Sequence, residues 1–256
     1  MTNAPLILVS NDDGVNAPGI CVLREALAPL GEVWCVAPET EQSANSHSLT
    51  LSRPLRHRTL SERVHAINGT PADCIYVALY HGSLLPRRPD LVVSGINHGP
   101  NLGSDIHYSG TVAAAREGAL RGIPAIAMSL CASEGLEDAA GLALSIARRL
   151  LEAKLPEGPT PLLNVNFPGP GPKGIRATRL GRRTYQDSIT VRLDPRNREY
   201  LWIGGPGPDP HAHIEGADTN AVDEGWVSVT PLSIEATRAD HFGLAAWVAG
   251  SEEEER

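Results

Sequence analysis

The sequence predicts an α/β protein: a Rossmann-like, mostly parallel sheet with helices on both faces, plus a C-terminal extension rich in β-hairpins. Short apolar segments of strand character alternate with helical patterns over the first two-thirds of the chain. These apolar segments are hydrophobic throughout, which is typical of parallel strands buried on both faces. After about residue 168 helical patterns become rare, and strand-like segments follow a linker rich in proline and glycine.

The first elements are expected between residues 6 and 80. Leu6–Ser10 is an apolar strand, and Pro18–Leu30 carries leucine and isoleucine at helical spacing. A second strand is expected over residues 32–37, before a polar loop, and residues 49–58 alternate weakly in an extended pattern. The segment at residues 70–80 predicts a helix, because threonine in the capping position precedes proline in the first turn.

The next elements repeat the alternation up to residue 168. Each apolar strand is followed by a helical pattern, and the alanine-rich helix near residue 110 has Ser109 or its neighbour as its expected cap. Strands are expected at residues 89–95, 123–130 and 160–168, and helices at residues 108–122 and 136–151.

The change of pattern near residue 168 predicts a division of the chain. Residues 1–168 form the expected catalytic domain, and residues 169–250 a β-rich extension that completes the fold. Residues 204–220 are expected to be a flexible loop, and residues 251–256 an acidic tail.

Composition excludes several classes of protein. The chain has 256 residues and a formal net charge of −8, which argues against a nucleic-acid-binding surface. The four cysteines form no CxxC pair, so a zinc site built on cysteine is not expected. Neither a signal peptide nor a membrane-spanning segment is recognised, and we expect a cytoplasmic protein that does not act at a membrane.

Two adjacent carboxylates, Asp12 and Asp13, follow the first strand in the segment "VSNDDGVNAPG". One interpretation is a turn, because Asn-Asp-Asp-Gly is good turn chemistry. The other is a cation site, because a divalent ion resolves the repulsion between two like charges. Oxygen ligands alone favour magnesium, manganese or calcium over zinc.

The loops after other strands offer neutral oxygen donors. Ser43 and Asn45 follow the second strand, and Asn97 and Asn101 follow the strand at residues 89–95. Because the carboxyl ends of parallel strands lie at one edge of a sheet, these loops are expected to converge on the acidic pair. Ser43 and Asn97 then complete the oxygen shell.

The segment Ser109-Gly110-Thr111 begins the alanine-rich helix. Free N–H groups and the positive end of the helix dipole form a phosphate cradle, and glycine allows close backbone approach. The simpler interpretation is ordinary helix capping by Ser109. Among the nine histidines, those in reach of the predicted crevice are candidates for protonating the leaving group: His47, His98 and His107.

Several motifs in order resemble the SurE survival-protein family of metal-dependent nucleotidases. They are "VSNDDGVNAPG", "APETEQSANSHSLTL", "GTPADC", "VVSGINHGPNLGSDIHYSGTVAAA" and "VSVTPL". The resemblance implies hydrolysis of nucleoside monophosphates to nucleoside and phosphate, as a 5′-nucleotidase, with 3′-nucleotidase and exopolyphosphatase activities as further options. It also implies one divalent cation per subunit, magnesium or manganese, and a homodimer or homotetramer formed through the C-terminal extension.

The same resemblance assigns roles to individual residues. Metal binding is implied for Asp12, Asp13, Ser43 and Asn97, and the two aspartates are also implied to be catalytic. Phosphate or substrate contact is implied for Ser109, Gly110 and Thr111, and with less weight for Asn45 and Asn101.

Two alternatives remain open on the residues alone. A phosphatase of broader specificity, active on short polyphosphate, needs the same site. A nucleotide sensor without turnover does not need the complete set of two aspartates, one serine and one asparagine. The complete set therefore favours an enzyme.

Overall fold

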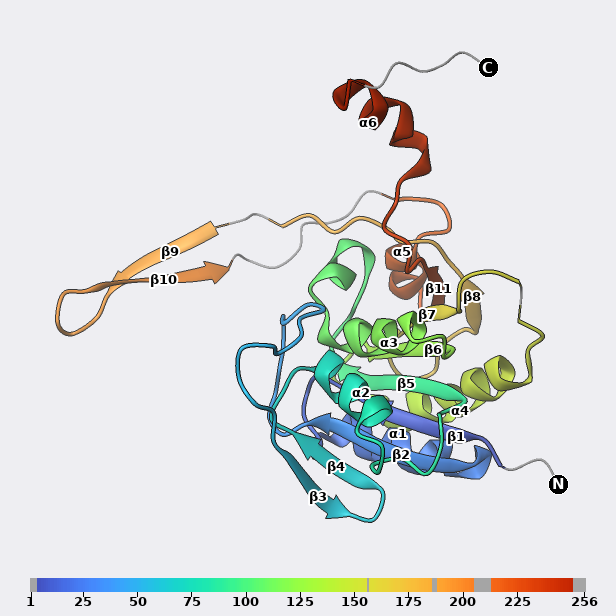
Figure 1. Ribbon diagram of the computed structural model, residues 1–256. Helices are drawn as coiled ribbons and strands as arrows, with labels where there is room; N and C mark the ends of the chain where they lie inside the picture. Colours follow the sequence, from blue (N-terminus) through green and yellow to red (C-terminus); the bar gives the residue numbers. More distant parts are fainter. Residues whose placement is uncertain (1–3, 156, 186–187, 205–212, 251–256) are drawn as a thin grey trace.

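A nine-stranded sheet crosses the centre of the computed structural model, which describes residues 4–155, 157–185, 188–204 and 213–250. The strand order is β3-β4-β2-β1-β5-β6-β7-β11-β8 (Figure 1). Its strands are β1 (Leu6–Ser10), β2 (Glu32–Pro38), β3 (His57–Ser61), β4 (Val64–Ile67), β5 (Leu91–His98), β6 (Ala125–Leu130), β7 (Leu162–Phe167), β8 (Ile175–Ala177) and β11 (Val227–Leu232).

The central part of this sheet is parallel. Strands β4, β2, β1, β5, β6 and β7 run in one direction. Strand β3 is antiparallel to β4, and β11 is antiparallel to β7. The predicted fold class is confirmed, but the β3–β4 hairpin was not predicted. Every residue of β3 is exposed, so this strand carries no hydrophobic pattern.

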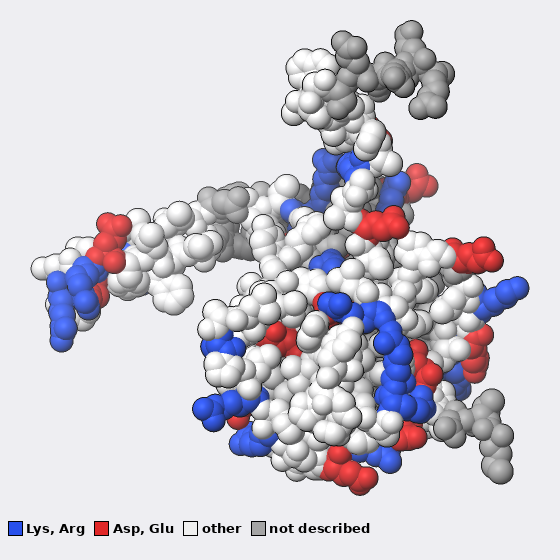
Figure 2. Space-filling model, viewed as in Figure 1, with Lys and Arg blue, Asp and Glu red and all other residues white. Residues whose placement is uncertain are grey.

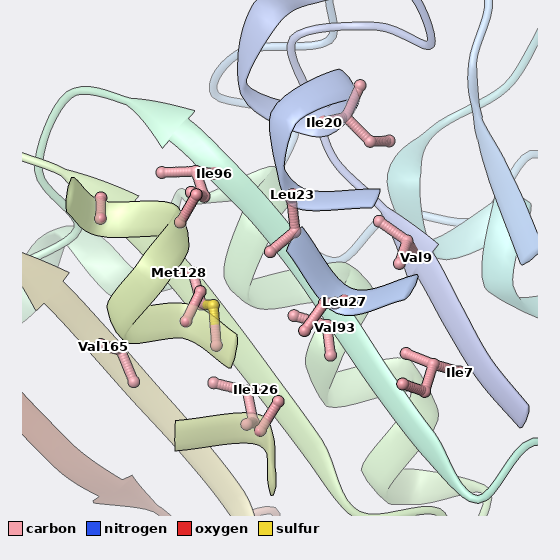
Figure 3. Packing of buried hydrophobic residues seen from close by; sticks show 14 of the residues in the cluster. Ile7, Val9, Ile20, Leu23, Leu27, Val93, Ile96, Ile126, Met128 and Val165 are labelled. Carbon is pink, nitrogen blue, oxygen red and sulfur yellow. The ribbon is translucent and has the colours of Figure 1, made fainter. Parts of the chain in front are cut away.

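Helices cover both faces of the sheet. Helices α1 (Pro18–Leu27) and α4 (Leu136–Glu152) pack together on one face, and α2 (Pro71–Tyr80) and α3 (Gly110–Leu120) on the other. Alternate residues of β1 enter different clusters: Ile7 packs with α1, as Figure 3 shows, and Leu8 packs with α2 and α3. The buried residues of both clusters are at most 7% exposed, and their burial provides the main stabilisation of the fold.

The helix starts on the α2–α3 face have the caps that the sequence predicts. Ser109 Oγ accepts a hydrogen bond from the Val112 N–H at 3.1 Å. Thr70 and Asp73 form a reciprocal capping box at the start of α2. These caps fix where each helix begins, and the start of α3 lies at the edge where β1 and β5 end.

The chain after residue 168 contributes to the central sheet and also extends beyond it. Strands β8 and β11 and helix α5 (Asp218–Asp223) pack at the edge of the sheet. Strands β9 (Ser188–Leu193) and β10 (Glu199–Gly204) form a separate antiparallel hairpin that projects from the body (Figure 1).

Two helices in this part were not predicted. Helix α5 begins inside the expected flexible loop, and α6 (Phe242–Val248) follows the short 3₁₀ turn η3 (Ala239–His241). The expected acidic tail, residues 251–256, lies outside the described residues, as does part of the expected loop, residues 205–212. None of the helices among the described residues combines the length and the apolar character that a membrane crossing requires.

Candidate active site

The acidic pair lies at the carboxyl end of β1, where the two carboxylates have different surroundings. The side chain of Asp12 is buried, with only 5% of its surface exposed, whereas Asp13 is half-buried. The turn that follows is held by Asn11, whose amide nitrogen donates to the Gly14 carbonyl at 2.9 Å. The turn interpretation is thus correct locally, and it does not exclude a cation site, because this hydrogen bond uses the Asn11 side chain and neither carboxylate.

The start of α3 lies against Asp12. A Cβ placed on Gly110 would come within 2.7 Å of the Asp12 Cβ, so only glycine permits this approach. The Thr111 hydroxyl, which is fully buried, donates a hydrogen bond to Asp12 Oδ1. The first turn of α3 therefore already contacts one anion, the Asp12 carboxylate, and the Thr111 hydroxyl positions that carboxylate.

Burial raises the pKa values of both aspartates. Desolvation raises the pKa of Asp12 to about 6, against a lowering by the Thr111 hydrogen bond and with a further increase from the Asp13 charge. Burial also raises the pKa of Asp13, offset by the His98 N–H and reinforced by the Glu41 charge. Among the described residues, these carboxylates thus carry an electrostatic cost that a bound cation removes.

The polar loop after β2 is held against this site. The Gln42 N–H donates to the Asp12 carbonyl at 2.8 Å, and the Ser46 N–H donates to the Tyr108 carbonyl at 3.1 Å. Ser43 is exposed on this loop, and its hydroxyl donates to Glu41 at 2.7 Å. The structure therefore brings the loop of Ser43 to the acidic pair.

A buried carboxylate, Glu117, anchors the same loop to α3. His47 Nε2 lies 2.8 Å from Glu117 Oε2, and Arg121 Nε donates to Glu117 Oε1 at 2.7 Å. Only 2% of the Glu117 side chain is exposed. Burial would raise its pKa, but hydrogen bonds from His47 and Arg121 hold the pKa of Glu117 below its ordinary value. His47 therefore has a structural partner.

The end of β5 forms the opposite wall of the site. The His98 N–H lies 3.3 Å from Asp13 Oδ2, and the Asn97 amide nitrogen donates to the Gly99 carbonyl at 2.8 Å, which leaves its side-chain oxygen available. The Gly95–Ile96 peptide bond is cis, and the pairing of β5 with β6 shifts beyond Ser94.

A cavity of about 480 Å³ opens beside this wall. Asp13, Asn97 and His98 line it together with apolar residues of β5, β6, α1 and α4. His107, the third histidine considered, is exposed on the 3₁₀ turn η2 (Gly103–His107).

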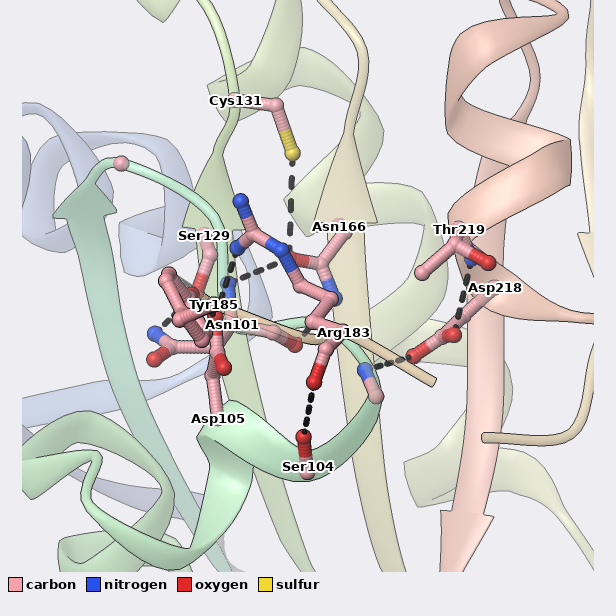
Figure 4. Close-up of polar contacts among 12 residues, drawn as sticks. Asn101, Ser104, Asp105, Ser129, Cys131, Asn166, Arg183, Tyr185, Asp218 and Thr219 are labelled. Atoms are coloured by element: carbon pink, nitrogen blue, oxygen red, sulfur yellow. Dashed lines mark hydrogen bonds and ion pairs between the residues drawn. The ribbon is translucent and has the colours of Figure 1, made fainter. Parts of the chain in front are cut away.

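Two predicted substrate contacts have other partners in the structure. The buried amide of Asn101 donates to Ser129 Oγ at 2.8 Å, and its backbone pairs with Asn166 (Figure 4). The amide nitrogen of Asn45 donates to Gln42 Oε1 at 2.7 Å on the exposed loop. These contacts indicate structural roles for both asparagines, and substrate contact stays a prediction.

The segment before α3 is also fastened to the C-terminal part of the chain. Asp218 Oδ2 accepts from the Gly103 N–H at 2.9 Å, and its other oxygen accepts from the Gly181 N–H at 2.7 Å. Arg183 pairs with Asp105 at 2.6 Å, as Figure 4 shows. The extension thus helps to set the position of the loop that leads into the first turn of α3.

The donor set fits a hard divalent cation. The available ligands are carboxylate, hydroxyl and amide oxygens, which magnesium and manganese prefer. The side-chain oxygen of Asn11, next to Asp12, is buried without a protein partner. Within the part of the chain that the structure describes, no three His, Cys, Asp or Glu side chains gather as a metal site, so a zinc-type cluster is not seen.

Sequence reasoning found Asp13, Asn97 and His98 in the cavity wall but missed its other residues. Glu41 lies in its wall, and Leu130, Ser133 and Leu136 come from the end of β6 and the start of α4. Their residue types did not indicate a functional site, because leucine in a strand or helix usually belongs to the hydrophobic core. Only the position of these residues, after the carboxyl end of a parallel strand, pointed to a crevice.

Comparison with known proteins identifies the family of the chain. The model of the family "Survival protein SurE" matches residues 7–187. The chain belongs to the SurE family. It is 55% identical over 248 residues to a 5′-nucleotidase SurE of Sorangium cellulosum, with 96% of each chain covered. It is 50% identical to one from Anaeromyxobacter sp. strain Fw109-5, covering 97% of this chain and 98% of the relative.

A solved structure also matches nearly the whole chain. The crystal structure of the SurE protein from Aquifex aeolicus aligns with a TM-score of 0.83 at 40% identity, covering 96% of this chain and 100% of that one. The predicted family and fold are therefore confirmed, and the relatives confirm the expectation of an enzyme of the 5′-nucleotidase class.

Proposed function

We propose that this enzyme is a divalent-metal-dependent phosphatase that hydrolyses nucleoside monophosphates to nucleoside and phosphate. The observation that carries the proposal is the pair Asp12 and Asp13 at the end of β1, the first buried and the second half-buried, both with raised pKa values and close to loops that carry oxygen donors. The relatives named 5′-nucleotidase support the substrate class.

Four residues would hold one cation per subunit, magnesium or manganese. They are Asp12 and Asp13 after β1, Ser43 on the loop after β2, and Asn97 near the end of β5. When bound, the cation supplies Lewis acidity toward a phosphate oxygen and toward the attacking water. Ser43 enters the shell once its hydroxyl turns from Glu41, which is a rotation of an exposed side chain.

The first turn of α3 would position the phosphate. Ser109 and Gly110 lie at the positive end of the helix, next to Asp12, so backbone N–H groups there meet phosphate oxygens. Thr111 acts on the same centre through Asp12, which it holds by its hydroxyl. These groups stabilise the equatorial oxygens as charge develops.

Proton transfer would fall to residues at the wall of the cavity. Asp13 is the more accessible aspartate and would accept the proton of the attacking water. His98 lines the same cavity and is exposed, so it would protonate the leaving oxygen. His47 is paired with Glu117 and His107 is exposed on η2, so neither is preferred for this step.

The test is phosphate release from AMP and GMP by metal-stripped protein, with magnesium or manganese added back. Asp13→Asn is expected to lower turnover by about 100-fold or more, since partners outside the ligand shell already cost 10–100-fold. Asp240→Asn, on an exposed turn far along the chain, is the matched control. A wild type that binds nucleotide but releases no phosphate with any metal would instead be a nucleotide sensor.

The same substrate panel covers the wider activities that the family resemblance implies. It includes 3′-AMP and a short polyphosphate beside the 5′-nucleotides. Hydrolysis of 3′-AMP would extend the proposal to 3′-nucleotidase activity, and hydrolysis of polyphosphate would extend it to exopolyphosphatase activity.

The four cysteines are all unpaired, which supports a reducing, cytoplasmic location.

Homo-oligomerisation through the C-terminal extension is part of the proposal. The β9–β10 hairpin exposes Ile189, Trp202 and Ile203, which are 63%, 62% and 92% exposed. Figure 2 shows its charged residues gathered toward the far end of the hairpin, with an uncharged surface along its length. An exposed apolar ribbon of this kind is typical of a surface that is buried against another copy of the chain.

The assembly is tested by molar mass in solution. Ile189 and Ile203 face each other across the hairpin, so the double variant Ile189→Asp/Ile203→Asp is expected to give monomers. Arg196→Ala, in the hairpin turn, is the matched control. A wild type that is already monomeric would contradict the proposal. Truncation after about residue 220 is less informative, because it removes β11 from the central sheet.

A further inference from the structure

The cavity beside the acidic pair is built by the fold and is not a packing defect. Its volume of about 480 Å³ lies within the range of roughly 300–1,000 Å³ that small-molecule sites occupy. It opens at the carboxyl ends of the parallel strands, where open α/β sheets bind their ligands.

The two sides of the acidic pair face different environments. Asp12 lies against Gly110 at the start of α3, on the face of the sheet that α2 and α3 cover. Asp13 lines the cavity, whose other walls come from α1 and α4 on the opposite face. A substrate held by its phosphate at α3 can therefore extend past Asp13 into the cavity.

Close approach of α1 to β5 shapes this space. A Cβ on Gly19 would lie 1.9 Å from the Ile96 carbonyl oxygen, so the glycine lets the helix rest on the strand. Leu130 closes the end of β6, and Leu136 begins α4 after a short loop. The result is a space with apolar walls on several sides and polar groups at its mouth.

The charges around the cavity indicate the neutral part of a substrate. Two carboxylates, Asp13 and Glu41, stand in its wall, and none of the residues that line it is lysine or arginine. An anion is therefore disfavoured inside the cavity. Apolar surfaces suit a flat heteroaromatic ring, and Glu41 can accept hydrogen bonds from the hydroxyl groups of a sugar.

We propose that this cavity is the nucleoside subsite of the enzyme. The base lies among Ile96, Leu130 and Leu136, the Ser133 hydroxyl meets its edge, and Glu41 accepts from the ribose hydroxyls. The inference rests on the proposed function, because it assigns the leaving part of the same substrate. It makes Ser133 and Leu136 determinants of substrate selectivity.

The sharpest perturbation fills the cavity from its exposed loop. Ser133→Phe places an aromatic ring in the space without replacing a buried side chain, and Glu134→Phe adds the same ring at the neighbouring exposed position, outside the cavity lining. Ser133→Phe is expected to lower the ratio of kcat/KM for AMP to kcat/KM for ribose 5-phosphate by about tenfold, or about 1.4 kcal/mol. Glu134→Phe should leave the ratio unchanged.

A second measurement uses no catalysis. Adenosine, which lacks the phosphate, is titrated calorimetrically into metal-stripped protein. Binding to wild type that is lost in Ser133→Phe and weakened in Leu136→Ser supports the subsite, and unchanged melting temperatures show that the variants fold. Equal adenosine affinity in wild type and Ser133→Phe, or no adenosine binding to wild type, would overturn it.

The two measurements separate this inference from the proposed function. Adenosine binding at the cavity without release of phosphate from any ester would leave the subsite standing and remove the hydrolase. Hydrolysis of AMP and ribose 5-phosphate with a ratio that Ser133→Phe does not change would leave the hydrolase standing and remove the subsite.

Discussion

Asp12→Asn is expected to make the metal-free protein more stable at neutral pH while abolishing hydrolysis. The carboxylate of Asp12 is 5% exposed, and burial raises its pKa from 3.8 to about 6. The folded state therefore binds a proton more tightly than the unfolded chain does. Because of this, the stability of the metal-free protein falls as pH rises from about 4 to about 6, and the full cost is present above pH 6.

The magnitude follows from the same values. One pKa unit is worth about 1.4 kcal/mol, so ionisation of Asp12 costs the folded state about 3 kcal/mol above pH 6. Asparagine carries no charge and can still accept the hydrogen bond from Thr111. Its amide nitrogen cannot accept a hydrogen bond from a backbone N–H as the second carboxylate oxygen does. This loss lowers the gain in stability by about 1 kcal/mol. The expected net gain is about 2 kcal/mol.

The assay is urea unfolding at fixed protein concentration in the presence of a chelator, in steps between pH 4 and pH 8. Wild type and Asp12→Asn should be close in stability near pH 4 and separate as pH rises. Asp90→Asn is the control, for which the opposite change in stability is expected. Burial raises the pKa of Asp90, but hydrogen bonds from Arg87 and the Leu6 N–H outweigh it and lower that pKa. That variant should lose stability at neutral pH.

Adding magnesium or manganese should reverse the order of wild type and Asp12→Asn, because the cation stabilises only the protein that binds it. The reasoning would be refuted by an Asp12→Asn protein that is less stable than wild type at pH 7.5 without metal. A stability difference that does not vary with pH would refute it equally, because the ionisation of the carboxylate is the stated cause.

Two further predictions test how the site is held. Gly110→Ala should lower metal affinity and turnover by about tenfold or more, because the new Cβ would lie 2.7 Å from the Asp12 Cβ. Calorimetric titration with manganese measures the affinity, and an unchanged affinity would contradict the prediction. Glu117→Gln should cost about 1.5–3 kcal/mol in urea unfolding, because it weakens the buried contacts with His47 and Arg121. The pKa of Glu117 is lowered, so this cost should disappear as pH falls through that lowered pKa, and a cost that persists in acid would point to packing.

The parts of the fold that sequence reasoning predicted share a strong local signal. The strand Leu6–Ser10 is apolar throughout, and the helix starts at Thr70 and Ser109 have side chains that accept backbone hydrogen bonds. Strand β3 was missed because all its residues are exposed and no hydrophobic period marks it. Helix α6 was missed because its seven residues are too few to show a helical period, although most of them are apolar. Tertiary pairing, not local preference, defines β3.

The candidate site divides in the same way. Asp12 and Asp13 were found because adjacent carboxylates after a buried strand are unusual in sequence alone. The partners of Asn101 and Thr111 were not predictable, since they depend on side-chain directions across strands and helices. The crevice was expected at this sheet edge, but Leu130, Ser133 and Leu136 in its wall were missed, because leucine and serine have many ordinary uses and only the assembled sheet places them beside Asp13.

The carboxylate of Asp218 has a consequence for how the chain is made. Its two oxygens bind the backbone N–H groups of Gly103, Gly181 and Thr219, so a residue from the last quarter of the chain fastens the loop that precedes α3. During synthesis from the N-terminus, Asp12 and α3 leave the ribosome long before Asp218 does. A nascent chain therefore carries its acidic pair for most of its synthesis without the clamp, and the catalytic edge gains its final geometry only when translation is nearly complete.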